Sequence, residues 1–92
     1  MTSQEHDDTQ LRELEERVRT TRWEMLDAME AARQLDRHVA KSASPRTLRS
    51  SALQKLYKDS GVRISQTTDA HSRAREALAR YQRTLRNRKE SE

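Results

Sequence analysis

The 92-residue sequence predicts an all-α protein, an antiparallel hairpin of two long helices that resembles a coiled coil. Ala, Glu, Lys, Leu and Arg together supply 47 of the 92 residues, which is the composition of long helices. A single Gly and a single Pro leave almost no turn residues for a β-rich fold. Two long segments also repeat their apolar residues at alternating spacings of three and four, the heptad pattern of helices that pack along a seam.

The first helix is expected over about residues 9–41, which contain neither Gly nor Pro. Residues 1–8 have no apolar residue after the initial Met and are expected to form a flexible acidic tail. Asp8 or Thr9 would cap the helix, because a side-chain oxygen at that point can accept a hydrogen bond from a free backbone N–H. The seam of this helix is formed by Leu11, Leu14, Val18, Thr21, Met25, Ala28, Ala32, Leu35 and Val39.

The second helix is expected over about residues 45–88, followed by a flexible tail at 89–92. Ser44 is a favourable N-cap, and Pro45 loses nothing at the first helical position because that N–H has no partner within the helix. Residues 9–88 would then form one helical-hairpin domain. The seam of this helix is formed by Leu53, Tyr57, Ser60, Ile64, Thr67, His71, Ala74, Leu78, Tyr81 and Leu85.

Gly61 leaves the continuity of the second helix open. Glycine costs about 1 kcal/mol in a helix interior, and the Val, Ile and Thr residues that follow are mediocre helix formers. One alternative is a continuous helix, which the unbroken heptad phase favours. The other is a break near 60–68, in which Thr67 or Thr68 caps a third helix.

An antiparallel hairpin requires that facing residue numbers have a constant sum, and a sum of 92 places the turn near residue 46. This register places small residues against large ones in several layers, as close packing requires. It also places His71 opposite Thr21. The other predicted pairs are Leu14 with Leu78, Val18 with Ala74, Met25 with Thr67, Ala28 with Ile64, Ala32 with Ser60, and Leu35 with Tyr57.

The charges favour the same antiparallel arrangement. Residues 1–44 carry 7 basic and 10 acidic side chains, whereas residues 45–92 carry 12 basic and 5 acidic ones. The acids concentrate in 5–16 and the bases in 73–89, two segments that become neighbours in a hairpin. Each exposed ion pair contributes only a few tenths of a kcal/mol, so these charges select the orientation without adding much stability.

Several apolar residues lie off the two seams and are the candidate interface: Trp23, Leu26, Met29, Leu48 and Leu56. A two-helix hairpin of this size also needs a further stabilising element. Three explanations are open: a homodimer that forms a four-helix bundle, a third helix that folds back after a break at Gly61, or a site for a different protein. The sequence therefore predicts a non-enzymatic interaction module, acting as an adaptor, accessory or regulatory protein through self-association or docking on a partner helix.

The alternative hypothesis is a small basic protein that binds nucleic acid. The formal net charge is +4 and the sequence pI is about 10.0. Phosphate contacts by Arg dominate this kind of affinity. The candidate contacts lie on the face of the second helix away from its seam and are Arg73, Arg80, Arg83 and Arg86.

Other function classes have no support in the sequence. There is no Cys, and the three His residues lie far apart, so no metal site or cofactor is expected. No set of convergent titratable groups indicates a catalytic site or a small-molecule substrate. No stretch approaches the ~18 apolar residues of a membrane span. The polar, acidic N-terminus lacks the features of a signal peptide, so a cytoplasmic location is expected.

Overall fold

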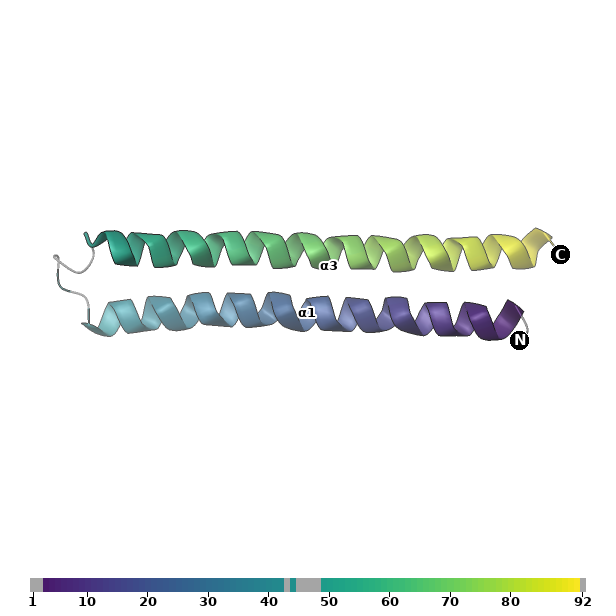
Figure 1. Cartoon of the computed structure of the whole chain (residues 1–92), viewed down its shortest axis with the longest axis horizontal. Coiled ribbons are helices and arrows are strands. Elements are labelled where there is room, and N and C mark those ends of the chain that lie inside the picture. The colour runs from purple at the N-terminus through teal and green to yellow at the C-terminus, as the bar shows by residue number, and fades with distance from the viewer. Residues whose placement is uncertain (1–2, 43, 45–48, 92) are drawn as a thin grey trace.

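The computed structural model describes residues 3–42, 44 and 49–91 and contains two long helices, α1 (Ser3–Ser42) and α3 (Ser51–Ser91). The helices lie side by side and run antiparallel, so that both ends of the chain lie at the same end of the molecule (Figure 1). The predicted all-α antiparallel hairpin is thereby confirmed.

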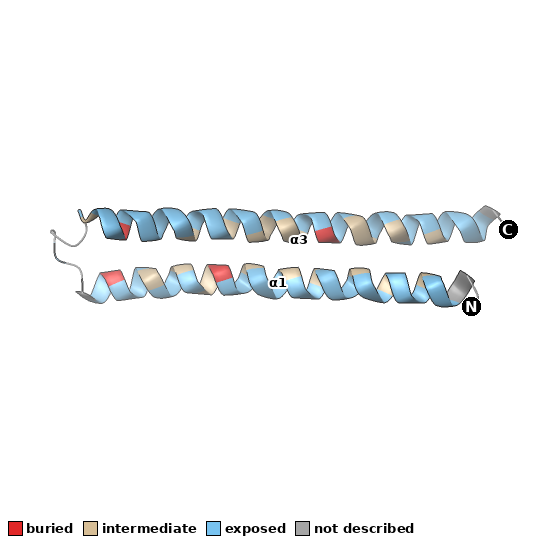
Figure 2. Ribbon diagram, viewed as in Figure 1, coloured by how far each residue is buried: buried red, intermediate tan, exposed pale blue. Residues whose placement is uncertain are grey.

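The hairpin is a rod rather than a globule. Its principal extents are 69 × 17 × 16 Å and its radius of gyration is 20.4 Å, against about 12 Å for a compact domain of this length. Each helix therefore has a single neighbour. Figure 2 shows that buried and half-buried positions follow the line where α1 and α3 meet, whereas the outer faces of both helices are exposed.

The first helix begins six residues earlier than the sequence indicated, at Ser3 instead of about residue 9. The expected cap at Asp8 or Thr9 is wrong, because the Thr9 hydroxyl donates a hydrogen bond to the Glu5 carbonyl at 2.9 Å, inside the helix. The tertiary structure supplies the reason for the longer helix. Asp7 is bound by two side chains of α3, a contact across 74 or more residues that local sequence patterns do not reveal.

The second helix is capped by Ser50. The Ser50 hydroxyl accepts a hydrogen bond from the backbone N–H of Leu53 at 3.1 Å, and Arg49 and Ser50 are not helical. The expected start at Pro45 lies outside the described residues, so α3 is described from Ser51. Its C-terminal end at Ser91 lies three residues beyond the expected one.

Gly61 does not interrupt α3, which is continuous from Ser51 to Ser91. Its φ angle is not positive, so the backbone has the ordinary helical conformation. Thr67 donates its hydroxyl to the carbonyls of Arg63 at 2.8 Å and Ile64 at 3.1 Å, inside the helix, and caps nothing. The three-helix alternative is therefore wrong, because the seam on both sides of Gly61 packs against α1 and outweighs a local cost of about 1 kcal/mol.

The core is a narrow line of seam residues. The apolar residues that are buried among the described positions are Ala28, Val39, Leu53 and Ala74. The predicted register is confirmed by His71 and Thr21, whose Nδ1 and Oγ1 atoms lie 3.1 Å apart. Val39 and Leu53, whose numbers also have a sum of 92, are both 8% exposed, which is consistent with the same register near the turn.

Candidate protein-interaction surfaces

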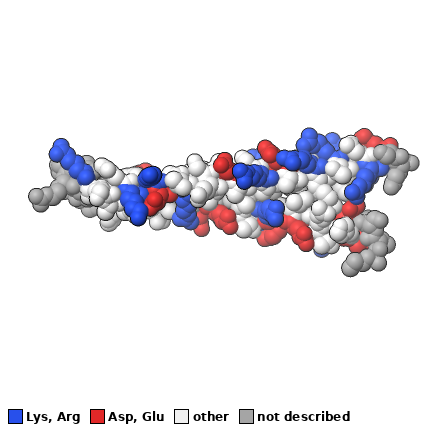
Figure 3. All heavy atoms as spheres, turned by 45° about the horizontal axis from the view of Figure 1, so that its top comes forward, with Lys and Arg blue, Asp and Glu red and all other residues white. Residues whose placement is uncertain are grey.

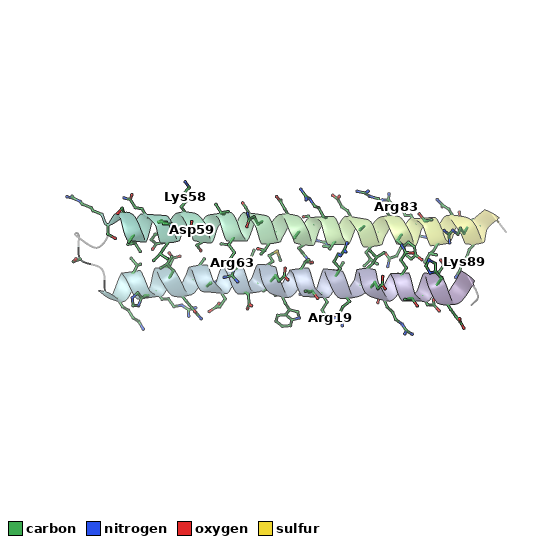
Figure 4. All side chains as sticks on the ribbon, in the orientation of Figure 1. Arg19, Lys58, Asp59, Arg63, Arg83 and Lys89 are labelled. Atoms are coloured by element: carbon green, nitrogen blue, oxygen red, sulfur yellow. The ribbon has the colours of Figure 1, made fainter. Side chains whose placement is uncertain are left out.

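The outer face of α1 carries the most exposed large apolar side chain of the described residues. Trp23 is 65% exposed and Leu26 is 39% exposed. At about 100° per residue, Trp23 lies on the side of α1 roughly opposite the seam. The two side chains line a shallow groove together with Glu15, Val18, Arg19 and Arg22. Figure 4 shows Arg19 on the side of α1 away from α3. This surface, named here the Trp23 groove, therefore runs from the half-buried seam residue Val18 to the outer face of α1.

Ion pairs lie on both sides of Trp23 and Leu26 along α1. On the N-terminal side, Arg19 Nη1 lies 2.8 Å from Glu16 Oε2. On the C-terminal side, Arg33 Nη1 lies 3.3 Å from Glu30 Oε2. All four side chains are between 44% and 66% exposed. An apolar centre with a charged rim on each side is the anatomy of protein–protein interfaces.

The five predicted interface residues do not form one surface. Met29 is half-buried and Leu48 lies outside the described residues. Leu56 is 54% exposed, but it lines a second groove between the helices, which shares no residue with the Trp23 groove. That second groove is lined by Ala28, Ala31, Leu35, Leu56, Asp59, Ser60 and Arg63. Trp23 and Leu26 are therefore the two predicted residues that the fold brings together.

A cluster of polar contacts joins the two helices near the ends of the chain. The Tyr81 hydroxyl lies 3.2 Å from both the Asp7 carbonyl oxygen and Asp7 Oδ1. Arg88 Nη1 donates to Oδ1 and Oδ2 of Asp7 at 3.2 and 3.4 Å. The Asp7 side chain is only 23% exposed, so it is held between the helices. The predicted pairing of the acidic and basic ends is confirmed at this contact.

Both tyrosines on the seam of α3 have altered acidity. Partial removal from water raises the pKa of Tyr81, and the hydrogen bond to the Asp7 carboxylate raises it further. Tyr57 has a raised pKa for the same two reasons, with Asp36 as its partner. The raised pKa keeps each phenol protonated, and the Tyr81 hydroxyl donates its hydrogen bond across the helices to Asp7.

The arginines near the C-terminal end of α3 remain on the surface. Arg73, Arg80, Arg83 and Arg86 are all exposed, and Figure 4 shows Arg83 pointing away from α1. Arg80 lies 3.4 Å from Glu76 of its own helix, whereas the other three form no ion pair with any described residue. Figure 3 shows this basic cluster beside the acidic side chains of α1, at the end of the rod where the chain begins and ends.

The described residues, 3–42, 44 and 49–91, contain neither a metal-binding cluster nor a membrane-spanning helix. No group of three or more His, Asp or Glu side chains there could hold a metal ion. No helix in the same residues is long and apolar enough to cross a membrane. No protein family, curated protein or solved structure matches this chain.

Proposed function

We propose that this protein is a non-enzymatic protein–protein interaction module that binds through the Trp23 groove. The exposure of Trp23 carries the proposal. A Trp side chain offers up to about 250 Å² of surface, so a side chain that is 65% exposed leaves roughly 160 Å² to cover, worth up to about 4 kcal/mol on burial. Trp is also one of the residue types enriched among interface hot spots, which cluster near the centre of an interface.

The form of the groove favours a helical partner. Its lining residues, from Glu15 to Leu26, form two neighbouring rows along one side of α1, and residues three or four apart lie next to each other. A partner helix can place its own side chains between them, as amphipathic helices do when they dock into grooves. The same mode serves self-association, in which two hairpins form a dimer of four helices.

The test is site-specific photo-crosslinking in the native host cell. A photoreactive phenylalanine replaces Arg22, which lines the groove and leaves Trp23 intact; the control carries the same group at Gln66, an exposed position on α3. We expect protein adducts at position 22 that disappear when Trp23→Ala and Leu26→Ser are added. Equal yields at the two positions, or adducts at position 22 that persist in the double variant, would refute the proposal.

Nucleic-acid binding is the second candidate function. It is favoured by the exposed Arg73, Arg83 and Arg86, which the acids of the described chain leave unpaired. Titration with duplex DNA and with RNA at about 50 mM and about 200 mM salt tests it, because counterion release predicts a steep loss of affinity. Arg83→Gln is expected to reduce the steepness of the plot of log affinity against log salt concentration by about one unit, the effect of one lost phosphate contact. Lys58→Gln, elsewhere on α3, is the control. Absence of binding at about 50 mM salt would refute this candidate.

A further inference from the structure

The outer face of α1 carries a second heptad seam, distinct from the one that packs against α3. Its members lie at alternating spacings of three and four and are exposed or half-exposed. In chain order they are Glu16, Arg19, Trp23, Leu26, Glu30 and Arg33. The order of chemical types along the helix is acid, base, apolar, apolar, acid, base. If a second copy of this helix lies alongside in the opposite direction, each acid faces a base and each apolar side chain faces another apolar side chain.

We propose that the occupant of the Trp23 groove is a second copy of this chain, docked antiparallel along this outer seam, an inference that rests on the proposed function. Facing residue numbers then have a sum of 49. Trp23 packs against Leu26 of the second copy. Arg19 faces Glu30 of the second copy, and Glu16 faces its Arg33. The two-fold axis repeats every contact, giving four complementary charge pairs around two apolar layers.

Charge complementarity selects this orientation over the alternatives. A parallel pair in register would place Glu16, Arg19 and every other charged member of the outer seam against its own kind. Like charges that face each other across a helix pair are destabilising. The intrahelical pairs Glu16–Arg19 and Glu30–Arg33 are solvent-exposed, so their charges can be shared with a second copy without uncovering a buried group.

The dimer contact is short, and weak association follows. From Glu16 to Arg33 the seam extends about 26 Å at 1.5 Å per residue. Beyond it, Arg12 would face Arg37 of the second copy, so the complementarity ends there. One such strip buries less than the roughly 1,200 Å² of a standard interface, the size class of weak and transient contacts.

The arrangement is compatible with the fold because the outer seam lies opposite α3. The two α1 helices would lie together, with one α3 on the outside of each. This is a row of four helices rather than a square bundle. Leu56 and its groove would take no part in the contact, since they lie between α1 and α3.

The experiment is sedimentation equilibrium of the purified chain from about 10 µM to about 500 µM. Trp23 fluorescence is measured in parallel, because Trp23 is the only tryptophan and its emission reports burial of the groove. Two double variants are compared with the wild type, Glu16→Arg with Arg19→Glu and Glu30→Arg with Arg33→Glu. Each keeps the net charge and an opposite-charge pair three residues apart, so helicity by circular dichroism is expected to be unchanged.

We expect the wild type to dimerise with a blue shift of Trp23 emission. Each double variant turns all four pairs into like-charge pairs and is expected to dimerise at least about tenfold more weakly. The chain that carries all four substitutions restores every antiparallel pair, and its affinity is expected to return to near the wild-type value. A parallel dimer would not become more stable in this quadruple variant than in the double variants.

Three results would overturn the inference. A wild type that stays monomeric at the highest concentration, while position 22 still crosslinks in a Trp23-dependent way, would assign the groove to a different protein and leave the proposed function standing. A dimer that Trp23→Ala with Leu26→Ser does not weaken would place the contact elsewhere on the chain. If the quadruple variant dimerises no more tightly than the double variants, the antiparallel register is refuted.

Discussion

Replacing Gly61 with Ala is expected to stabilise the hairpin. Gly61 lies inside α3, where its backbone is helical and its φ angle is not positive. A Cβ atom built at this position meets nothing within 4 Å. The substitution therefore adds no clash and no strain, and it removes the entropic cost of ordering a glycine.

The magnitude follows from helix propensity. Ala is favoured over Gly by about 1 kcal/mol in a helix interior, and the exposed environment of Gly61 adds no packing contribution. For a chain of this size, 1 kcal/mol raises the melting temperature by about 4–8 °C. Ser65→Ala, at an exposed position one turn later, is the matched control and is expected to contribute about half as much.

The assay is thermal and urea unfolding followed by helical circular dichroism at a fixed protein concentration. Fixing the concentration matters because self-association would itself raise the melting temperature. A Gly61→Ala chain with an unchanged or lower free energy of unfolding would contradict the reasoning. It would mean that α3 bends at residue 61 in solution, or that another surface contacts this position.

Three further predictions concern packing, capping and titration. Leu53→Ala, at a buried position, is expected to cost about 2–4 kcal/mol of unfolding free energy, whereas Leu56→Ala, at a position 54% exposed, is expected to cost less than about 1 kcal/mol; equal costs in urea unfolding would refute the assigned core. Ser50→Ala removes the N-cap of α3 and is expected to cost about 1 kcal/mol, with Ser65→Ala again the control for serine replacement. The raised pKa values of Tyr57 and Tyr81 mean that the folded state favours the protonated phenols. Their contribution to stability is therefore complete below pH 10 and is lost as the pH rises through the higher folded pKa values. Ultraviolet titration should give a tyrosinate midpoint above 10 in buffer and near 10 in urea; the same midpoint in both would contradict this.

The register of the hairpin was predictable because it depends on a pattern that is repeated many times. Every layer of both seams obeys the same spacing, so one constant sum places His71 opposite Thr21, and the structure shows that contact at 3.1 Å. The ends of the helices depend on single residues instead. Ser50 caps α3, a role that the sequence did not single out because Ser is an equally good cap at several neighbouring positions.

The candidate site was predictable in part. Periodicity identified Trp23 and Leu26 as apolar residues off the seam, and the structure shows both exposed in one groove. Periodicity could not show that Leu56 belongs to a different surface. The spacing of residues within one helix does not say which residues of the other helix lie beside them. The structure places Leu56 in a different groove, between the helices.

By itself, the sequence determined the helical class, the antiparallel pairing and the position of His71 opposite Thr21, because helix propensity and heptad spacing are local properties that add up along the chain. The tertiary structure decided what depends on contacts between distant segments. It extended α1 to Ser3, where Asp7 binds Tyr81 and Arg88 of α3. It kept α3 continuous through Gly61, because packing against α1 on both sides exceeds a local cost of about 1 kcal/mol. It also left the Trp23 groove uncovered, because a second helix can cover only one face of α1.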